Sequence, residues 1–383
     1  MKEVFILGDA NISNTTKFSS LLSGSKTPIS TSIDENTDTA IVYTSGTTGY
    51  PKGVILTHRN LLTNGTAIAR AVKMTESDRF MCILPLFHVN GMTVTIMAPL
   101  CSGGSMILNE TFSATKFWET LAKYRATGFS AVPTVYSILL NRPEVQGLDL
   151  SSLRFGICGA APLPVELMRA FEEKFKMIII EGYGLTEGTC ASCVNPIDGT
   201  RKPGSIGVPL ENIEMKIFDD NDNELEAGKI GEIVSRGPNT MKGYFKNAEA
   251  TAQTLKNNWL HTGDIGYVDN DGYFYIVDRK KDMIIRGGEN IYPREVEEVL
   301  YKHPKVLEAA VIGLPDKIWG EAVVAVIVLK KNEIIDEKDI IAFCKERLAD
   351  YKCPKRVYFK ESLPKTATGK IQKQLLKKMI MND

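Results

Sequence analysis

Short apolar runs rich in β-branched residues alternate with helix-like stretches along the first half of the chain. The runs predict strands, and the apolar positions that recur every three or four residues between them predict helices. Because these strands are apolar on both faces, they favour a largely parallel sheet covered by helices. The expected strands are 39–43, 81–84, 105–108, 129–132, 153–158 and 177–180, and the expected helices are 59–72, 114–124 and 164–175.

The pattern changes after about residue 210. Segments 213–235 and 266–277 are typical of antiparallel hairpins, with turns at 219–222 and 269–272. The tail then reads as strand, helix, two strands, helix, strand and a basic helix. We therefore expect an α/β protein with a large N-terminal α/β domain that contains a β-rich subdomain (1–278) and a small α+β C-terminal domain (279–383).

Composition narrows the class of protein. The 383 residues contain 46 Lys and Arg and 46 Asp and Glu, so the formal net charge is zero. A protein that binds nucleic acid usually has a basic excess. No apolar run approaches the ~18 residues of a membrane helix, and the N-terminal apolar patch is too short for a signal peptide. Seven scattered cysteines indicate reduced thiols. We expect a cytoplasmic enzyme without a transmembrane segment or a nucleic-acid partner.

A loop rich in glycine and hydroxyl groups follows the first predicted strand. Glycines let backbone amides crowd an anion, hydroxyls donate to its oxygens, and Lys52 adds a point charge. A Walker A loop is excluded, because Pro51 precedes Lys52 and Gly53 stands where a magnesium-binding Ser or Thr is required. We interpret this segment as a phosphate loop of another type rather than a flexible turn. It reads Thr44-Ser45-Gly46-Thr47-Thr48-Gly49-Tyr50-Pro51-Lys52-Gly53.

This loop resembles the phosphate-binding signature of the adenylate-forming superfamily, which includes acyl-CoA synthetases, 4-coumarate–CoA ligase-like enzymes, peptide-synthetase adenylation domains and luciferases. Four further segments occur in the family's order, from about Asp34 to the C-terminus. The resemblance implies that ATP phosphates bind Thr44, Ser45, Gly46, Thr47, Thr48, Gly49 and Lys52.

The segment 181–187 follows a predicted buried strand, where an open α/β sheet binds ligands. A tyrosine between two glycines can lie flat against a purine, and a carboxylate is a suitable magnesium ligand. By resemblance, Tyr183 and Gly184 contact adenine, Thr186 contacts the α-phosphate as a catalytic residue, and Glu187 is catalytic and binds Mg²⁺. We expect a second wall near the adenine from Gly159, Ala160 and Ala161.

Later segments complete the expected nucleotide and thiol sites. Asp264 matches an aspartate that accepts both ribose hydroxyls, and Arg279 matches an arginine that reaches the nucleotide. Lys281 matches the hinge about which the small domain of relatives rotates between two half-reactions. By the same resemblance, Gly287 and Gly288 line the passage for the pantetheine arm of coenzyme A.

Lys370 matches the family's lysine that bridges the substrate carboxylate and the α-phosphate. Two such anions 4 Å apart repel by about 4 kcal/mol at an effective dielectric of 20, and one charged donor supplies ~3 kcal/mol in a transition state. On charge alone, Lys370 is not distinguished from Lys365 or Lys373. Only the motif identifies it as catalytic.

Residues 84–92 resemble the family's acyl-pocket segment. His88 matches an aromatic side chain that gates the approaching carboxylate and is expected to be catalytic. No Asp or Glu occurs from Leu84 to Met106, so the pocket cannot offset a substrate ammonium. A fatty, aryl or other plain carboxylic acid is favoured. The expected acyl-pocket residues are Val89, Asn90, Gly91 and Gly156.

The resemblance implies an ATP-dependent acid–thiol ligase that uses ATP, Mg²⁺ and coenzyme A to form an acyl-adenylate and then an acyl-CoA. Two alternatives stay open: an acyl-adenylate ligase that loads a carrier protein, and a truncated nucleotide-binding module without turnover. Relatives have many more residues before the phosphate loop than the 43 present here, so we expect the large domain to be incomplete at its front. A homodimer is compatible with these expectations.

Two segments imitate other sites. Cys190 and Cys193 have a redox-like spacing, but no second cysteine pair accompanies them, so we expect pocket-side thiols. Asp269 begins an apparent EF-hand, but Lys280 stands where that loop needs an acidic residue. We expect a hairpin turn there.

Overall fold

The computed structural model describes residues 5–6, 16–24, 27, 31–44, 51–142, 145–161, 163–366 and 371–382. The chain divides into two compact units, Met1–Thr37 and Asp38–Asp383. In the first, the short strands β1 (Phe5–Ile6) and β2 (Thr16–Lys17) pair in parallel before a 3₁₀ turn, Phe18–Ser23. All other elements belong to the second unit. No helix among the described residues has the length and apolar character needed to cross a membrane.

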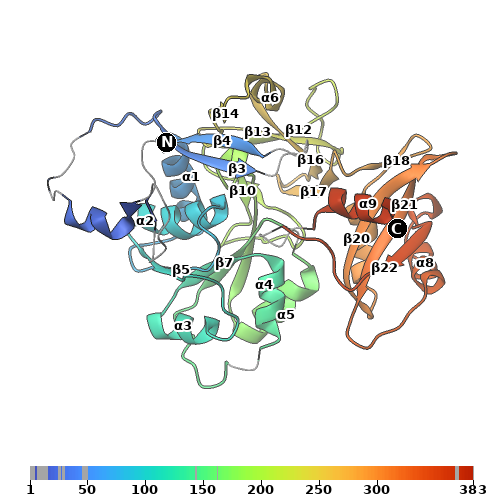
Figure 1. Cartoon of the computed structure of the whole chain (residues 1–383), viewed down its shortest axis with the longest axis horizontal. Helices are drawn as coiled ribbons and strands as arrows, with labels where there is room; N and C mark the ends of the chain where they lie inside the picture. The colour runs from blue at the N-terminus through green and yellow to red at the C-terminus, as the bar shows by residue number, and fades with distance from the viewer. Residues whose placement is uncertain are drawn as a thin grey trace. The chain divides into compact units, whose positions relative to one another are not determined.

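A seven-stranded sheet forms the centre of the second unit (Figure 1). Five strands are parallel in the order β9-β8-β7-β5-β6, and β10 and β11 extend the sheet antiparallel beyond β9. The predicted parallel sheet is thereby confirmed for the strands between residues 79 and 183. The strands are β5 (Arg79–Cys82), β6 (Ser105–Leu108), β7 (Gly128–Ala131), β8 (Phe155–Cys158), β9 (Ile178–Tyr183), β10 (Cys193–Val194) and β11 (Val208–Pro209).

Helices cover both faces of this sheet. Consecutive side chains of a strand point to opposite faces, and in β8 Ile157 and Cys158 belong to two different core clusters. The Cys158 cluster contains aromatic side chains of the helices α3, α4 and α5, and the Ile157 cluster contains apolar side chains of α1 and of a π-helix. The helices are α1 (His58–Ala71), the π-helix Asn90–Met97, α2 (Ala98–Cys101), α3 (Phe117–Tyr124), α4 (Pro133–Leu140) and α5 (Val165–Phe175).

The predicted strand 39–43 does not belong to the parallel sheet, and that expectation was wrong. It forms β3 (Asp38–Thr44), which pairs antiparallel with β4 (Lys52–Thr57), and β4 pairs with β14 (Gly243–Tyr244). Along β3, partly buried and exposed residues alternate, the pattern of a strand with only one covered face. The connecting loop, residues 45–50, lies outside the described residues.

The β-rich subdomain contains both predicted hairpins. β12 pairs with β13, and β16 pairs with β17, all antiparallel. The turn at 269–272 is closed by the Gly272 N–H, which donates to the Asp269 carbonyl, and Lys202 binds the Asp269 carboxylate at 2.6 Å. The hairpin turn is therefore confirmed. The elements are β12 (Glu214–Phe218), β13 (Gly231–Arg236), α6 (Ala248–Thr254), β15 (Leu255–Lys256), β16 (Trp259–Val268) and β17 (Phe274–Arg279).

The C-terminal part has three layers. Val311 and Ala325 share a cluster with α7 and α8, whereas the neighbouring residues Ala310 and Val324 share one with α9, so helices cover both faces of its sheet. The predicted element order is confirmed, except that its first strand is a hairpin, β18–β19. The boundary between residues 278 and 279 stays a prediction. The elements are β18 (Ile284–Arg286), β19 (Glu289–Ile291), α7 (Pro293–Tyr301), β20 (Val306–Asp316), β21 (Gly320–Leu329), α8 (Glu337–Lys345), a 3₁₀ turn (Asp350–Lys352), β22 (Arg356–Phe359) and α9 (Lys373–Asn382).

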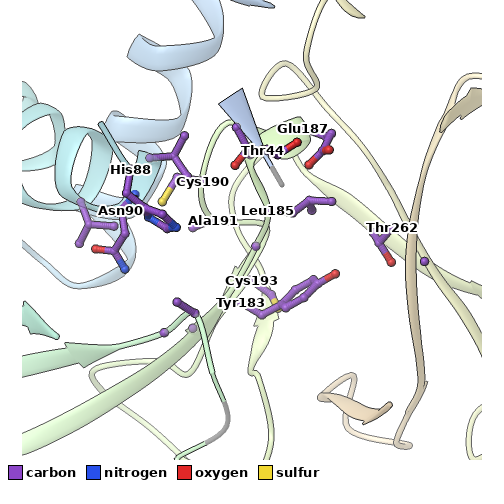
Figure 2. Close-up of a pocket in the computed structure, with 18 of the residues that line it drawn as sticks. Thr44, His88, Asn90, Tyr183, Leu185, Glu187, Cys190, Ala191, Cys193 and Thr262 are labelled. Atoms are coloured by element: carbon purple, nitrogen blue, oxygen red, sulfur yellow. The ribbon is translucent and has the colours of Figure 1, made fainter. Parts of the chain in front are cut away.

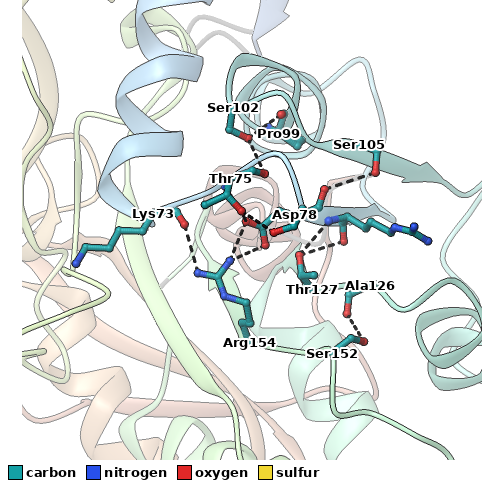
Figure 3. A network of polar contacts seen from close by, with 12 residues as sticks. Lys73, Thr75, Asp78, Pro99, Ser102, Ser105, Ala126, Thr127, Ser152 and Arg154 are labelled. Atoms are coloured by element: carbon teal, nitrogen blue, oxygen red, sulfur yellow. Dashed lines mark hydrogen bonds and ion pairs between the residues drawn. The ribbon is translucent and has the colours of Figure 1, made fainter.

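Asp78 connects segments at the amino ends of the parallel strands (Figure 3). Its almost fully buried carboxylate accepts hydrogen bonds from the Thr75 N–H at 2.7 Å and from Arg154 Nη1 at 2.6 and 2.8 Å. Arg154 also donates to the Lys73 carbonyl. Burial raises the pKa of Asp78, but hydrogen bonds from Thr127, Thr75 and Arg154 outweigh it and leave this pKa below the usual 3.8.

Replacing Asp78 by asparagine is expected to lower the free energy of unfolding by about 2 kcal/mol near pH 7, because charge-assisted hydrogen bonds are lost. A depressed carboxyl pKa stabilises the fold above the usual value of 3.8 and ceases to do so as the pH falls through the folded value. The variant and the parent protein should therefore converge in acid. Urea unfolding at several pH values measures this, with the exposed Asp198→Asn as control. Equal stability near pH 7 would contradict it.

Candidate functional site

A cavity of ≈ 610 Å³ lies at the carboxyl ends of β8 and β9 (Figure 2). Its lining residues come from β3 and β4, from α1 and the π-helix, and from β16 and the segment after β17. Open α/β sheets bind ligands at this edge. The sequence motifs placed the ligand site here.

Most predicted site residues within the described part of the chain meet at this cavity. Asp264 does not line it but bonds to Tyr183, which does. Five other predicted residues are not among those that line the cavity: Gly91, Gly156, Ala161, Gly287 and Gly288. Six predicted site residues lie outside the described residues: Ser45, Gly46, Thr47, Thr48, Gly49 and Lys370. The individual role of every predicted site residue stays a prediction. The lining includes Thr44, Lys52, His88, Val89, Asn90, Gly159, Ala160, Tyr183, Gly184, Thr186, Glu187, Arg279 and Lys281.

Close packing explains why glycine occupies several of the predicted site positions. A Cβ at Gly184 would lie 1.7 Å from the Cys190 carbonyl oxygen, so no other residue fits while the loop keeps this path. A Cβ at Gly91 would lie 2.4 Å from the Pro85 carbonyl oxygen, and one at Gly156 would lie 2.4 Å from the hydroxyl oxygen of Tyr136. Gly91 and Gly156 therefore permit close packing behind the cavity.

Tyr183, Asp264 and Arg279 form one polar cluster. The Tyr183 hydroxyl donates to Asp264 Oδ2 at 2.6 Å, and Arg279 Nε lies 3.0 Å from Asp264 Oδ1. Asp264 is 3% exposed, so its charge is balanced mainly by this arginine. Burial and the Asp264 carboxylate raise the pKa of Tyr183, and the same carboxylate raises the pKa of Arg279. The cluster presents a neutral phenol and a cation to a ligand.

Glu187 and Lys52 both contact Tyr244. Glu187 Oε1 accepts a hydrogen bond from the Tyr244 hydroxyl at 2.7 Å, and Lys52 Nζ lies 4.9 Å from the centre of the Tyr244 ring. Thr44 faces Lys52 across the β3–β4 pair. A carboxylate, an ammonium and a hydroxyl therefore surround the place where the sequence predicts a triphosphate and its metal.

The other side of the cavity is formed by the helical layer. Figure 2 shows His88, Asn90 and Cys190 grouped there, opposite Thr262. Asn90 Oδ1 accepts from the Ser130 hydroxyl at 2.8 Å, which fixes its side-chain amide. Burial raises the pKa of the Cys190 thiol to about 12, so the thiol stays neutral.

The cysteine prediction is confirmed in its location. Cys190 and Cys193 both line the cavity as free thiols. Within the described residues, no group of three His, Cys, Asp or Glu side chains is placed to hold a metal ion. The two thiols therefore belong to the apolar wall of the cavity.

Several lining residues have no clear signal in the sequence. Glu232 Oε1 accepts the Gly263 N–H at 2.9 Å and its Oε2 lies 3.3 Å from His261 Nδ1, so it supports the part of β16 that carries Asp264. Tyr244 comes from β14, an edge strand of two residues. Both positions depend on strand pairings distant in sequence, which no local motif records.

Glu181, next to the cavity at the end of β9, is a buried carboxyl group. Its Oε1 accepts the Leu163 N–H at 3.3 Å, and its Oε2 has no hydrogen-bond partner within the described structure. Burial raises the pKa of Glu181 to about 7, with smaller opposing effects from that bond and from Arg294. Glu181 is therefore a carboxyl group that titrates near neutral pH.

Glu181→Gln is expected to stabilise the protein by about 3 kcal/mol near pH 8 and to have little effect near pH 4.5. The folded state holds a proton on Glu181 up to about pH 7, whereas the unfolded state releases it near the usual 4.5. The parent protein therefore loses stability as the pH rises through this range, and the glutamine variant does not. Urea midpoints across the range measure the difference, with the exposed Glu173→Gln as control. A pH-independent difference would contradict this.

Comparison with protein families gives two matches. Residues 2–245 match the family described as AMP-binding enzyme, and residues 295–370 match the AMP-binding enzyme C-terminal domain. A long-chain-fatty-acid–CoA ligase of Bacillus subtilis (strain 168) is 44% identical over 365 residues, which cover 94% of this chain and 65% of that protein. An oxalate–CoA ligase of Arabidopsis thaliana is 43% identical over 88% of this chain and 66% of its own length. The chain thus spans just under two thirds of these relatives.

Solved structures show the same fold. ATP-bound MatB of Rhodopseudomonas palustris superposes with a TM-score of 0.86 and 37% identity over 90% of this chain and 69% of that one. The o-succinylbenzoate CoA synthetase of Bacillus subtilis with an acyl-adenylate intermediate gives a TM-score of 0.85 and 35% identity, over 95% and 74%. The expected architecture of a large α/β domain with a small C-terminal domain is confirmed.

Proposed function

We infer the function from one premise: this chain belongs to the AMP-binding enzyme family. We propose that it ligates a carboxylic acid to the thiol of coenzyme A with ATP. A carboxylate oxygen attacks the α-phosphorus and the bond to the β-phosphate breaks, which gives an acyl-adenylate and pyrophosphate. The thiol, with loss of its proton, then attacks the acyl carbon, and AMP leaves. The acid is a fatty or aryl carboxylic acid.

The observation that carries this proposal is the chemical difference between the two sides of one cavity. Thr262 of β16, Arg279 at the end of β17 and Lys281 just after it line the cavity and offer polar and cationic groups to a nucleotide. His88 and Asn90 lie with the helical layer, where the surrounding side chains are largely apolar. An anionic nucleotide and an organic acid can therefore meet between them.

We assign the roles at the reacting centre from the sequence motifs. Lys370 neutralises the carboxylate and the α-phosphate as they approach, Thr186 donates to the α-phosphate, and His88 orients the carboxylate. Gly287 and Gly288, at the β18–β19 turn with φ of +61° and +87°, admit the pantetheine arm. Lys281 is the hinge residue in this proposal.

Glu187 is the proposed metal ligand. The bond from Tyr244 occupies Oε1 only in part, because carboxylate oxygens each have two lone pairs, so the carboxylate retains capacity for a hard cation such as Mg²⁺. Bound Mg²⁺ would neutralise part of the triphosphate charge. The donor set therefore fits a metal held mainly by the phosphates.

Glu187→Ala is expected to raise the magnesium concentration for half-maximal pyrophosphate release about tenfold, because one anionic ligand is lost. Tyr244→Phe is the matched control: it removes the hydrogen bond to Glu187 but keeps the carboxylate. A magnesium titration of both variants measures the difference. An unchanged titration for Glu187→Ala would remove it as a ligand.

Pyrophosphate release from ATP, screened over a set of carboxylic acids, tests the proposed function. Release that depends on one class of acid supports it, and ADP with phosphate as products would contradict it. AMP release driven by free coenzyme A distinguishes the proposal from carrier-protein loading. ATP binding without pyrophosphate exchange for any acid would support a module without turnover. A cytoplasmic location and a homodimer stay predictions.

A further inference from the structure

The helical side of the cavity has a wall that the sequence motifs do not contain. Asn64 and Ile68 are four residues apart and so share one face of α1, and Val72 follows directly after the end of this helix. Asn64 Nδ2 donates to the Ala191 carbonyl at 2.7 Å, and the Ala191 N–H donates to Asn64 Oδ1 at 3.1 Å. This pair of bonds fixes that face of α1 against the segment after Tyr183. Ile68 and Val72 both line the cavity.

This wall is apolar and tightly closed. Val72 and Cys193 have no exposed surface, and Ile68 and Val94 are each 4% exposed. Val72, Ile68 and Val94 belong to the same core cluster as Cys190 and Cys193. These side chains therefore form a closed, apolar part of the cavity lining.

Charge is confined to the rest of the cavity. Among the described lining residues, the lysines and arginine are Lys52 from β4 and Arg279, Lys280 and Lys281 from the segment that ends β17. The lining contributed by α1 and the π-helix carries no charged side chain. A second anionic group on the substrate would meet no cationic side chain of α1 or the π-helix there, which is unfavourable.

We propose that the substrate acid carries a single carboxylate and a short aliphatic chain, and that Ile68 and Val72 form the end wall that limits the length of this chain. This inference rests on the proposed function and refines it, because it selects short monocarboxylic acids from the wider class. Each methylene that fits should raise kcat/KM about fourfold. The first methylene that meets the wall should lower it about tenfold, since packed interiors resist overfilling.

The test measures kcat/KM for pyrophosphate release over a series of straight-chain monocarboxylic acids, with the dicarboxylic acid of each length alongside. Ile68→Ala and Val72→Ala are expected to move the optimum to longer chains and to raise the rate with the first excluded acid about tenfold. Leu61→Ala is the matched control, because Leu61 is buried on the same helix but does not line the cavity. It should leave the chain-length profile unchanged.

Ile68→Phe provides the opposite change and should move the optimum to shorter chains, so the inference is tested even if an alanine variant does not fold. If the protein uses monocarboxylic acids but the Ile68 and Val72 variants keep the chain-length profile of the parent protein, the inference is overturned and the proposed ligase activity stands. A preference for dicarboxylic acids would overturn it as well. No pyrophosphate release with any acid would instead contradict the proposed function on which it rests.

Discussion

Lys370→Ala is expected to slow adenylate formation by roughly 100- to 1,000-fold while leaving thioester formation from supplied acyl-adenylate nearly unchanged. The loss corresponds to one charged donor removed from the transition state, and the repulsion between carboxylate and α-phosphate, about 4 kcal/mol at 4 Å and a dielectric of 20, then opposes the reaction. Only the first half-reaction joins two anions. The effect should therefore separate the two half-reactions.

Two separate assays measure this. Acid-dependent pyrophosphate exchange reports adenylate formation, and release of AMP from purified acyl-adenylate with coenzyme A reports the second step. Lys378→Ala, on the exposed side of α9, is the matched control and should retain both activities. If Lys370→Ala lowers both half-reactions equally, the assignment of Lys370 to adenylation alone is wrong.

Asp264→Ala is expected to raise the KM for ATP about 100-fold and to lower the free energy of unfolding by about 3 kcal/mol. The substitution removes the acceptor of the Tyr183 hydroxyl and the counter-ion of Arg279. Because half of the Arg279 side chain is exposed, water can solvate its charge, so most of the expected cost comes from the buried Tyr183 hydroxyl that loses its acceptor. In the proposed function the substitution also removes the acceptor for the ribose hydroxyls.

Asp264→Asn separates these two effects. Its amide oxygen still accepts from Tyr183, so much of the stability should return, whereas the charge that pairs with Arg279 is absent. ATP titrations and urea unfolding of both variants measure the two quantities, with Asp198→Asn as the exposed control. An unchanged KM for ATP in a destabilised Asp264→Ala would show that Asp264 has only a structural role.

The parallel sheet was predictable because its strands are buried on both faces and therefore read as continuous apolar runs. The same rule wrongly placed β3 in the parallel sheet, because a short apolar run does not reveal that the strand pairs with the next strand across a hairpin. The π-helix Asn90–Met97 was not predicted either, because its hydrogen bonding has no periodic pattern in the sequence. The local sequence therefore predicts where a strand or helix forms better than it predicts which other elements pair with it.

The candidate site shows the same division. Tyr183, Glu187 and Asp264 could be found because each belongs to a recognisable motif, at the end of β9, just after it and within β16. Ile68 and Val72 could not, because an apolar helix face that lines a cavity has the same pattern as one that fills a core. Their position follows from the Asn64–Ala191 contact, which joins segments far apart in the chain.

The most direct test of the proposed ligase uses a carboxylic acid labelled with heavy oxygen in its carboxylate. The protein is incubated with ATP, magnesium, coenzyme A and the labelled acid, and the nucleotide products are analysed by mass spectrometry. Direct attack of the carboxylate on the α-phosphorus transfers one labelled oxygen, so AMP should carry one heavy oxygen and pyrophosphate none. ADP as the product, or AMP free of the label, would contradict acyl-adenylate formation by this chain.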